Sequence, residues 1–275
     1  MQSAKTGQAE ACPTKMPYRT LHLEFSGEIA MITLSRPEKR NAITAEMIAE
    51  LLAAFDEVEA SPARVLILTG AGKAFCSGMD LEALRTLASQ SPAEQRQDAD
   101  RIASLCLRIW SFPKPTIAAV NGPAIAGGCG IATLCDFTMA VPEAKFGYPE
   151  VRIGFLPAVV SVFLVRQIGE KRARDLLLSG RTIDAAEALR LGLVTQIVPA
   201  KELTIAAQVL AANLLGCSPV SLSMTKKLLL DCAGPEITRE LELAAAQSAQ
   251  IRTTLDFQEG LESFLGKRAP RWTGK

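Results

Sequence analysis

Two short apolar segments, residues 64–70 (RVLILTG) and 116–122 (TIAAVNG), constrain the fold class of this chain. A strand that is apolar at nearly every position is usually covered on both faces, as in a parallel sheet flanked by helices. Amphipathic helical patterns separate the two segments, so strands and helices alternate along the chain. We therefore expect an α/β fold whose core strands pair largely in parallel.

A hairpin is expected before this core, and helices are expected after it. Residues 19–25 and 29–35 alternate apolar and polar side chains around the turn SGE. Beyond about residue 200, helical patterns follow one another with no strand between them. The sequence therefore predicts a flexible leader at 1–16, a core at 17–200 and a C-terminal helical region at 201–275, which docks on the core or on another subunit.

Composition limits the partners of this protein. The 275 residues include 30 basic and 29 acidic side chains, a balance that argues against nucleic acid as the main partner. The longest apolar runs are too short to cross a bilayer, so no membrane partner is expected. The first sixteen residues contain neither an apolar segment nor an arginine, so no targeting peptide is indicated. We therefore expect a cytoplasmic protein.

The cysteines and the single histidine exclude several kinds of chemistry. The seven cysteines show no C-x-x-C spacing, which favours buried free thiols in a reducing compartment. Cys76 and Cys129 flank glycines, but a Cys–His mechanism would need His22, which lies in the expected hairpin. One histidine is too few for an imidazole-based zinc site. We expect no metal site.

Two loops of similar design follow the two apolar strands. Residues 74–80 (AFCSGMD) and 124–130 (AIAGGCG) both place glycine where a strand gives way to a helix. The N–H groups at a helix N-terminus lack intrahelical acceptors and carry the positive end of the dipole. Two such termini facing one another would form an oxyanion hole. Tight turns with a packing role are the alternative interpretation of each loop taken alone.

Nucleotide-binding motifs do not account for these glycines. The segment TGAGK resembles a phosphate-binding loop, but Ile67 stands where the motif needs its first glycine. Neither loop contains G-x-G-x-x-G. The phosphate-loop and dinucleotide-binding interpretations therefore fail.

Six blocks, which cover about Tyr18 to Trp272, resemble the crotonase (enoyl-CoA hydratase/isomerase) superfamily in their order. They are LSRPEKRNAI, GKAFCSGMDL, PTIAAVNGPAIAGGCGIATLCD, AKFGYPEVRIGFLP, GRTIDAAEALRLGLV and EGLESFLGKRAPRW. The resemblance implies a spiral of repeated ββα turns with a C-terminal helical trimerisation region. It also implies a homotrimer or a dimer of trimers that acts on acyl-CoA thioesters, with no cofactor beyond the CoA of the substrate.

The resemblance assigns roles to residues of both glycine loops. The N–H groups of Met79 and Gly127 are expected to hold the thioester carbonyl oxygen and to stabilise an enolate. Phe264 and Lys267 match positions that can reach the CoA of a neighbouring subunit. The remaining residues expected to contact substrate or CoA are Arg40, Ala42, Ala74, Ser77, Gly78, Asp80, Leu81 and Gly128.

The acid–base groups depart from the two-glutamate pattern of family hydratases. The second glutamate is present as Glu150, whereas Gly130 occupies the position of the first. Glu150 alone could hydrate a 2-enoyl-CoA, with water filling the space beside Gly130, and this is the preferred hypothesis. It could instead serve a Δ3-Δ2-enoyl-CoA isomerase, or an acyl-CoA decarboxylase or lyase. A non-catalytic acyl-CoA or RNA binder on the same fold is a remote alternative.

The segment after Pro157 indicates the shape of the acyl pocket. Residues 158–160 (AVV) replace a glycine-rich run found in many relatives, so this wall should be bulky and apolar. Such a lining favours a short or medium acyl chain.

Overall fold

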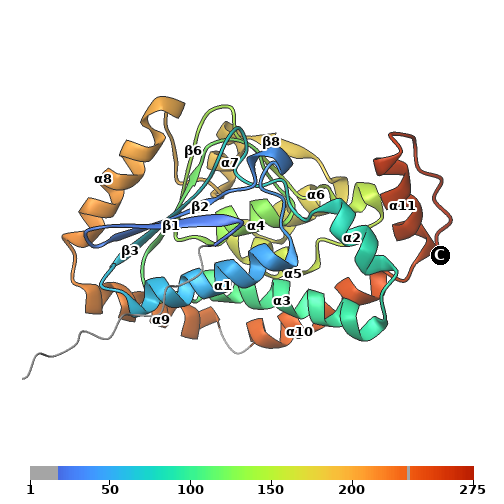
Figure 1. The fold of residues 1–275 in the computed structure, drawn as a ribbon, viewed down its shortest axis with the longest axis horizontal. Coiled ribbons are helices and arrows are strands. Elements are labelled where there is room, and N and C mark those ends of the chain that lie inside the picture. Colours follow the sequence, from blue (N-terminus) through green and yellow to red (C-terminus); the bar gives the residue numbers. More distant parts are fainter. Residues whose placement is uncertain (1–17, 234–235) are drawn as a thin grey trace, which may run out of the picture.

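The computed structural model describes residues 18–233 and 236–275, so the predicted leader and Cys12 lie outside the described residues. A six-stranded sheet, ordered β1-β2-β3-β4-β6-β9, forms the centre of the molecule (Figure 1). Its strands are β1 (Leu21–Ser26), β2 (Ile29–Leu34), β3 (Val65–Gly70), β4 (Thr116–Val120), β6 (Phe137–Ala140) and β9 (Gln196–Ile197). Only the β1–β2 pair of this sheet is antiparallel. The expected hairpin and parallel core are therefore confirmed.

A smaller sheet, ordered β5-β7-β8, lies next to the candidate site. Its strands are β5 (Ala124–Ile125), β7 (Lys145–Gly147) and β8 (Thr182–Asp184). β5 pairs in parallel with β7, and β7 pairs antiparallel with β8. Because β5 leads directly into the second glycine loop, this sheet fixes where that loop begins.

Helices enclose the large sheet. α8 packs on β3 and β4, and α1 packs beside α3 below the sheet in Figure 1. The helices are α1 (Ala45–Ala60), α2 (Leu81–Ala88), α3 (Pro92–Trp110), α4 (Gly127–Leu134), α5 (Ala158–Ile168), α6 (Glu170–Ser179), α7 (Ala185–Leu191), α8 (Leu203–Leu215), α9 (Pro219–Ala233), α10 (Glu236–Ile251) and α11 (Leu255–Leu265). Short 3-10 helices lie at Pro37–Lys39, Pro149–Ile153 and Ala200–Glu202. β9 is the last strand among the described residues.

Local sequence explains how the elements begin and which faces they bury. Thr44 caps α1 by accepting a hydrogen bond from the Met47 N–H, and Phe55 on the buried face packs edge-to-face against Phe112. One large hydrophobic cluster joins the sheet to most helices. A second, separate cluster consists of Leu84, Phe257 and Leu261, which join α2 to α11. α11 is thus anchored apart from the main core.

The prediction of buried free thiols is confirmed for four of the six described cysteines. Cys76, Cys106, Cys129 and Cys135 are buried and free, and burial raises the pKa of each thiol to about 12. The other two, Cys217 and Cys232, are also free but exposed, so the prediction of burial is wrong for them. Cys76 and Cys129 are therefore protonated at neutral pH, which argues against a role as nucleophiles.

Candidate active site

The two glycine loops lie against one another with almost no side chain between them. A Cβ on Gly128 would overlap the backbone carbonyl of Cys76, and a Cβ on Gly78 would lie 3.6 Å from the Gly127 nitrogen. The Ile125 N–H donates to the Cys76 carbonyl at 2.9 Å, which fixes the register between the loops. The glycines are therefore needed because the backbones approach so closely.

This contact leaves two backbone N–H groups unpaired. Gly78 accepts a hydrogen bond from the Ile43 N–H, and the Asp80 N–H donates to Ile43, so the intervening Met79 N–H faces the other way. Gly127 is the first residue of α4, and its N–H has no intrahelical acceptor. Within residues 18–233 and 236–275, neither N–H donates to another group. Both donors are available to a ligand.

Ala126 directs the Gly127 N–H through an unusual backbone conformation. Its φ of 54° and ψ of −127° are values that residues with a side chain rarely adopt. Its own N–H donates to the Gly147 carbonyl at the end of β7, at 2.8 Å. The small sheet therefore holds the start of α4 in a strained conformation, as often occurs at functional sites.

Glu150 lies three residues beyond Gly147, on the 3-10 helix Pro149–Ile153. Its side chain is buried, and Oε2 has no hydrogen-bond partner among the described residues. Burial raises the pKa of this carboxyl to about 7, because the charged form loses its hydration. Two titratable groups interact with it electrostatically, Cys129 and Tyr148, and burial raises the pKa of both far from neutrality. Glu150 is thus poised to exchange a proton at neutral pH.

Val160 occupies the space beside Gly130. A Cβ on Gly130 would lie 2.6 Å from the Val160 Cγ1 atom, which is closer than real Cβ contacts. A methyl group from the first turn of α5 therefore takes up space in which water was expected. Ala158 and Val159 of the same turn are buried as well, as expected for an apolar wall.

The loops predicted to bind CoA are brought together by a residue that the sequence analysis missed. Asn41 is fully buried, and its Nδ2 atom donates to the carbonyls of Ala71, Ala74 and Phe75 at 2.9, 2.9 and 3.1 Å. These bonds tie the loop after β2 to the loop after β3. Asn41 also has a left-handed φ of 54°, which asparagine tolerates better than most residues. A polar residue within the segment RNAI, between β2 and α1, was the available signal in the sequence.

The other residues predicted to contact substrate or CoA have different surroundings in the structure. Ala42 and Ala74 are buried and Arg40 is exposed, and the Ser77 N–H donates to the Arg40 carbonyl at 3.0 Å, so these residues share one surface. Gly78 and Gly128 hold the loops together, as described above. Because it caps α2 and pairs with Arg36 at 3.1 Å, the Asp80 carboxylate has a structural role here.

Leu81, Phe264 and Lys267 lie at or near α11. Leu81 packs on the small cluster of α2 and α11. Phe264 and Lys267 are exposed at the C-terminal end of α11, where the Lys267 N–H donates to the Phe264 carbonyl at 3.1 Å. Within one subunit the structure does not bring these two residues to the CoA loops.

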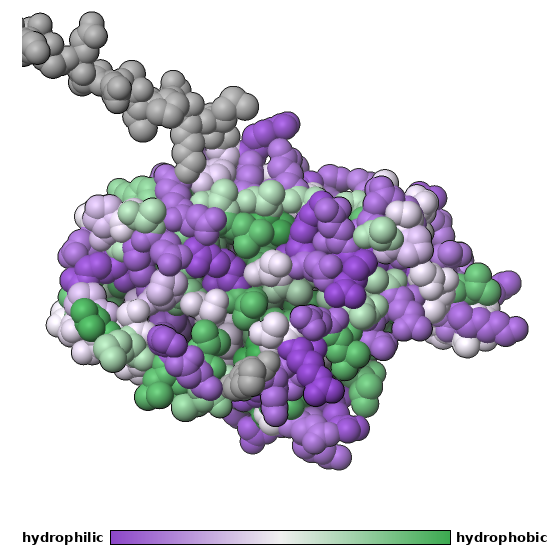
Figure 2. All heavy atoms as spheres, turned by 90° about the horizontal axis from the view of Figure 1, so that it is seen from below, coloured by the Kyte–Doolittle hydropathy of each residue, from purple (hydrophilic) through white to green (hydrophobic). Residues whose placement is uncertain are grey.

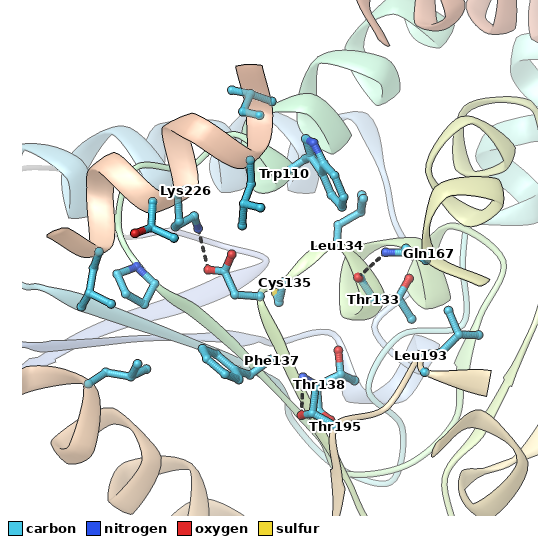
Figure 3. A pocket seen from close by; sticks show the side chains of 18 residues that line it. Trp110, Thr133, Leu134, Cys135, Phe137, Thr138, Gln167, Leu193, Thr195 and Lys226 are labelled. Carbon is cyan, nitrogen blue, oxygen red and sulfur yellow. Dashed lines mark hydrogen bonds and ion pairs between the residues drawn. The ribbon is translucent and has the colours of Figure 1, made fainter. Parts of the chain in front are cut away.

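A separate cavity of about 510 Å³ lies between the end of α4, the start of β6 and α9 (Figure 3). None of the predicted site residues lines it. Its charged groups and the Gln167 amide are already paired, because Lys226 Nζ donates to Asp136 and Gln167 Nε2 donates to the Thr133 carbonyl. Most of its remaining lining is apolar, including Trp110. This cavity offers no free acid or base.

Known proteins resemble this chain over most of its length. A family model described as enoyl-CoA hydratase/isomerase matches residues 24–275. A Thermus thermophilus protein assigned as an enoyl-CoA hydratase is 44% identical over 247 residues, covering 90% of this chain and 98% of that protein. A crotonyl-CoA hydratase of Syntrophomonas wolfei is 32% identical, with 94% and 100% covered. The crystal structure of an enoyl-CoA hydratase/isomerase from Xanthobacter autotrophicus Py2 superimposes with a TM-score of 0.85 at 32% identity, with 93% and 99% covered.

Proposed function

Because this chain belongs to the enoyl-CoA hydratase/isomerase family, we propose that it is an enzyme that adds water to a 2-enoyl-CoA thioester. One arrangement carries the proposal. A buried carboxyl that titrates near neutrality follows directly after the strand that holds the start of α4, where a backbone N–H is unpaired. Relatives named as enoyl-CoA hydratases support the choice of reaction.

The two N–H groups stabilise the charge that develops on the substrate. When water adds to C3, the electrons of the double bond move towards the thioester, and negative charge collects on its carbonyl oxygen. The N–H groups of Met79 and Gly127 donate to this oxygen. Since both donors are fixed before the substrate binds, they stabilise the enolate with little reorganisation.

Glu150 transfers the proton in both steps. As a carboxylate it accepts a proton from water while the water oxygen bonds to C3. The enolate carbon C2 then takes that proton back from the Glu150 carboxylic acid, which restores the starting enzyme. The proton that Glu150 takes from water is thus returned to the product, so one carboxyl is sufficient for hydration. The reaction needs no cofactor beyond the CoA that the substrate carries.

The experiment is a substrate panel with the purified protein. Crotonyl-CoA should lose its enoyl absorbance, and mass spectrometry in ¹⁸O-labelled water should show one labelled oxygen in the product. A 3-enoyl-CoA and a malonyl-type CoA ester test the other reactions. Absence of hydration, together with conversion of 3-enoyl-CoA to 2-enoyl-CoA, would contradict the proposal.

Isomerisation of a 3-enoyl-CoA to a 2-enoyl-CoA is the second candidate. Val160 favours it, because its methyl group occupies the space in which water was expected, beside Gly130. A carboxylate can move a proton between C4 and C2 without any water. The substrate panel separates the two reactions directly, since only hydration adds oxygen.

The active unit is a homotrimer or a dimer of trimers. Apolar side chains gather on the exposed faces of α8 and α9, and α9 has no buried residue. Figure 2 views the side on which α9 and α10 lie and shows apolar patches between polar ones. No single described helix is long and apolar enough to cross a membrane. The exposed apolar residues are Ile205, Val209, Val220, Met224, Leu228 and Leu229.

A second copy of this chain is the occupant that fits this surface. Leu229 is exposed and also lines the cavity of Figure 3, so the apolar surface continues into a hollow. Association of two copies would cover both the exposed apolar surface and the cavity. In such an assembly, the resemblance implies that Lys267 and Phe264 of one subunit reach the CoA of a neighbour.

A further inference from the structure

Among the described residues, no other side chain forms a hydrogen bond with the catalytic carboxyl proposed above. Oε2 of Glu150 has no partner among the described residues, and Glu150 lies on a 3-10 helix of five residues. Such a short helix has little stability of its own. The position of the carboxyl therefore depends on what the backbone of residues 149–155 packs against.

That backbone packs directly on α11. A Cβ on Gly154 would overlap the Asp256 carbonyl, and a Cβ on Gly260 would overlap the carbonyl of Ile153. Glycine on both sides lets the two backbones touch without an intervening side chain. A displacement of α11 must therefore move the segment that carries Glu150.

Phe155 links this segment to Arg252. Its N–H donates to the Glu150 carbonyl at 3.0 Å. Its ring packs on Phe257 of α11, with 5.3 Å between the ring centroids. The Arg252 guanidinium carbon lies 5.5 Å from the Phe155 ring centroid, which is within the range of a cation–π contact.

Arg252 is a fully buried cation between α10 and α11. Its Nη1 atom donates to Asp98 Oδ2 of α3 at 2.9 Å, and both side chains are buried. Nε and Nη2 have no hydrogen-bond partner among the described residues. Unpaired buried donors cost stability, so a role in packing alone explains this arginine poorly.

We propose that Arg252, paired with Asp98, is a positioning residue that holds α11 and Phe155 in place and thereby sets the position of the Glu150 carboxyl. The proposal rests on the catalytic role of Glu150 stated above. α11 packs on the small cluster of Leu84, Phe257 and Leu261 rather than on the main core, and the buried ion pair ties the turn just before this helix to α3.

The test removes both charges at once, in the double variant Arg252→Met/Asp98→Asn, so that no buried charge is left unpaired. We expect kcat to fall at least about tenfold, because small displacements of a catalytic group have large effects on rate. KM should change less than about threefold, since the CoA loops of the same subunit are untouched and Phe264 and Lys267 lie at the opposite end of α11 from Arg252. The pKa of Glu150 should fall towards its ordinary value as water reaches the loosened segment.

The Glu150 titration is read without turnover, by NMR of protein labelled with ¹³C at the glutamate carboxyl. The Glu150 signal is assigned by its loss in Glu150→Gln. Failure of wild-type protein to hydrate enoyl-CoA would therefore overturn the proposed function while leaving this comparison intact. A folded double variant with wild-type kcat and wild-type titration would overturn the positioning role.

The matched control is Arg166→Met/Glu240→Gln. This pair joins α5 to α10 at 2.7 Å. Its loss should lower the melting temperature without changing kcat or the Glu150 titration. If the Arg252 double variant does not fold, the Phe155→Leu variant tests the proposal instead. It removes the ring through which Arg252 contacts the segment that carries Glu150. An unchanged Glu150 titration in folded Phe155→Leu would contradict the proposal.

Discussion

Gly130 on α4 and Val160 on α5 face each other so closely that a Cβ on the glycine would lie 2.6 Å from the valine Cγ1 atom. The valine fills the place where a second acidic side chain would have to lie. Among the described residues, Glu150 therefore remains the acid–base candidate, and Val160 places an apolar side chain beside Gly130. This contact links the chemistry of the site to the packing of two helices.

Gly130→Glu alone should not improve hydration, because the new side chain overlaps Val160. We expect this variant to lose stability and activity. Gly130→Glu/Val160→Ala should fold and should exceed Val160→Ala in hydratase kcat by at least about tenfold, the low end of the range for an added acid–base group. Steady-state assays on crotonyl-CoA, with Val160→Ala as the control, measure this. A Gly130→Glu variant that is more active than wild type would show that Val160 does not block a side chain at position 130.

Gly127→Val should lower kcat by at least about 100-fold, the usual scale for loss of one oxyanion donor, because the branched side chain would occupy the place of the thioester oxygen and keep it from the N–H. A Cβ at Gly127 would meet only the Ile43 Cδ1 atom, at 3.2 Å, so the fold should survive. Circular dichroism checks the fold, and Gly127→Ala provides an intermediate size. Wild-type kinetics in folded Gly127→Val would end the oxyanion assignment.

Glu150→Gln should lower kcat by at least about 100-fold, because the amide cannot transfer the proton. In wild-type protein, kcat/KM for hydration should rise with pH and level off above about 7, since burial raises the pKa of Glu150 to about 7 and the carboxylate is the active form. Rates from pH 5 to 9 test this. A flat profile, or a fully active Glu150→Gln variant, would exclude Glu150 as the base.

The same substitution should stabilise the protein at alkaline pH. The pKa of Glu150 rises from 4.5 to about 7 on folding, so the folded state binds more protons between these values and stability falls as pH increases. Above pH 7 the cost is about 3 kcal/mol. Glu150→Gln carries no such cost, so its advantage in denaturant unfolding should appear above pH 4.5 and reach its full size near pH 8. Equal stability at pH 8 would contradict this.

The assembly is tested by light scattering at micromolar concentration, where we expect at least a trimer. Leu228→Asp places a charge on the exposed apolar face of α9 and should dissociate the oligomer. Lys201→Glu, at an exposed position before α8, is the control and should leave the mass unchanged. A wild-type monomer would refute the assembly and would leave Lys267 without a neighbouring CoA to reach.

The sequence alone determined which helices and strands form and at which positions the backbone must carry no side chain. Apolar strands, helix caps and glycine positions are local signals, since each depends on residues within a few positions. They sufficed to predict the parallel core and two glycine loops of similar design, whereas Met79, Gly127 and Glu150 were singled out by the resemblance of longer sequence blocks to a known family.

Only the tertiary structure decided what surrounds these groups. Val160 against Gly130, the hydrogen bonds of Asn41 and the Arg252–Asp98 pair join residues 30 to 154 positions apart. The pKa of Glu150 likewise depends on burial, which no stretch of sequence around it specifies. Such contacts follow from how whole elements pack, because packing brings together side chains that have no local relation in the chain.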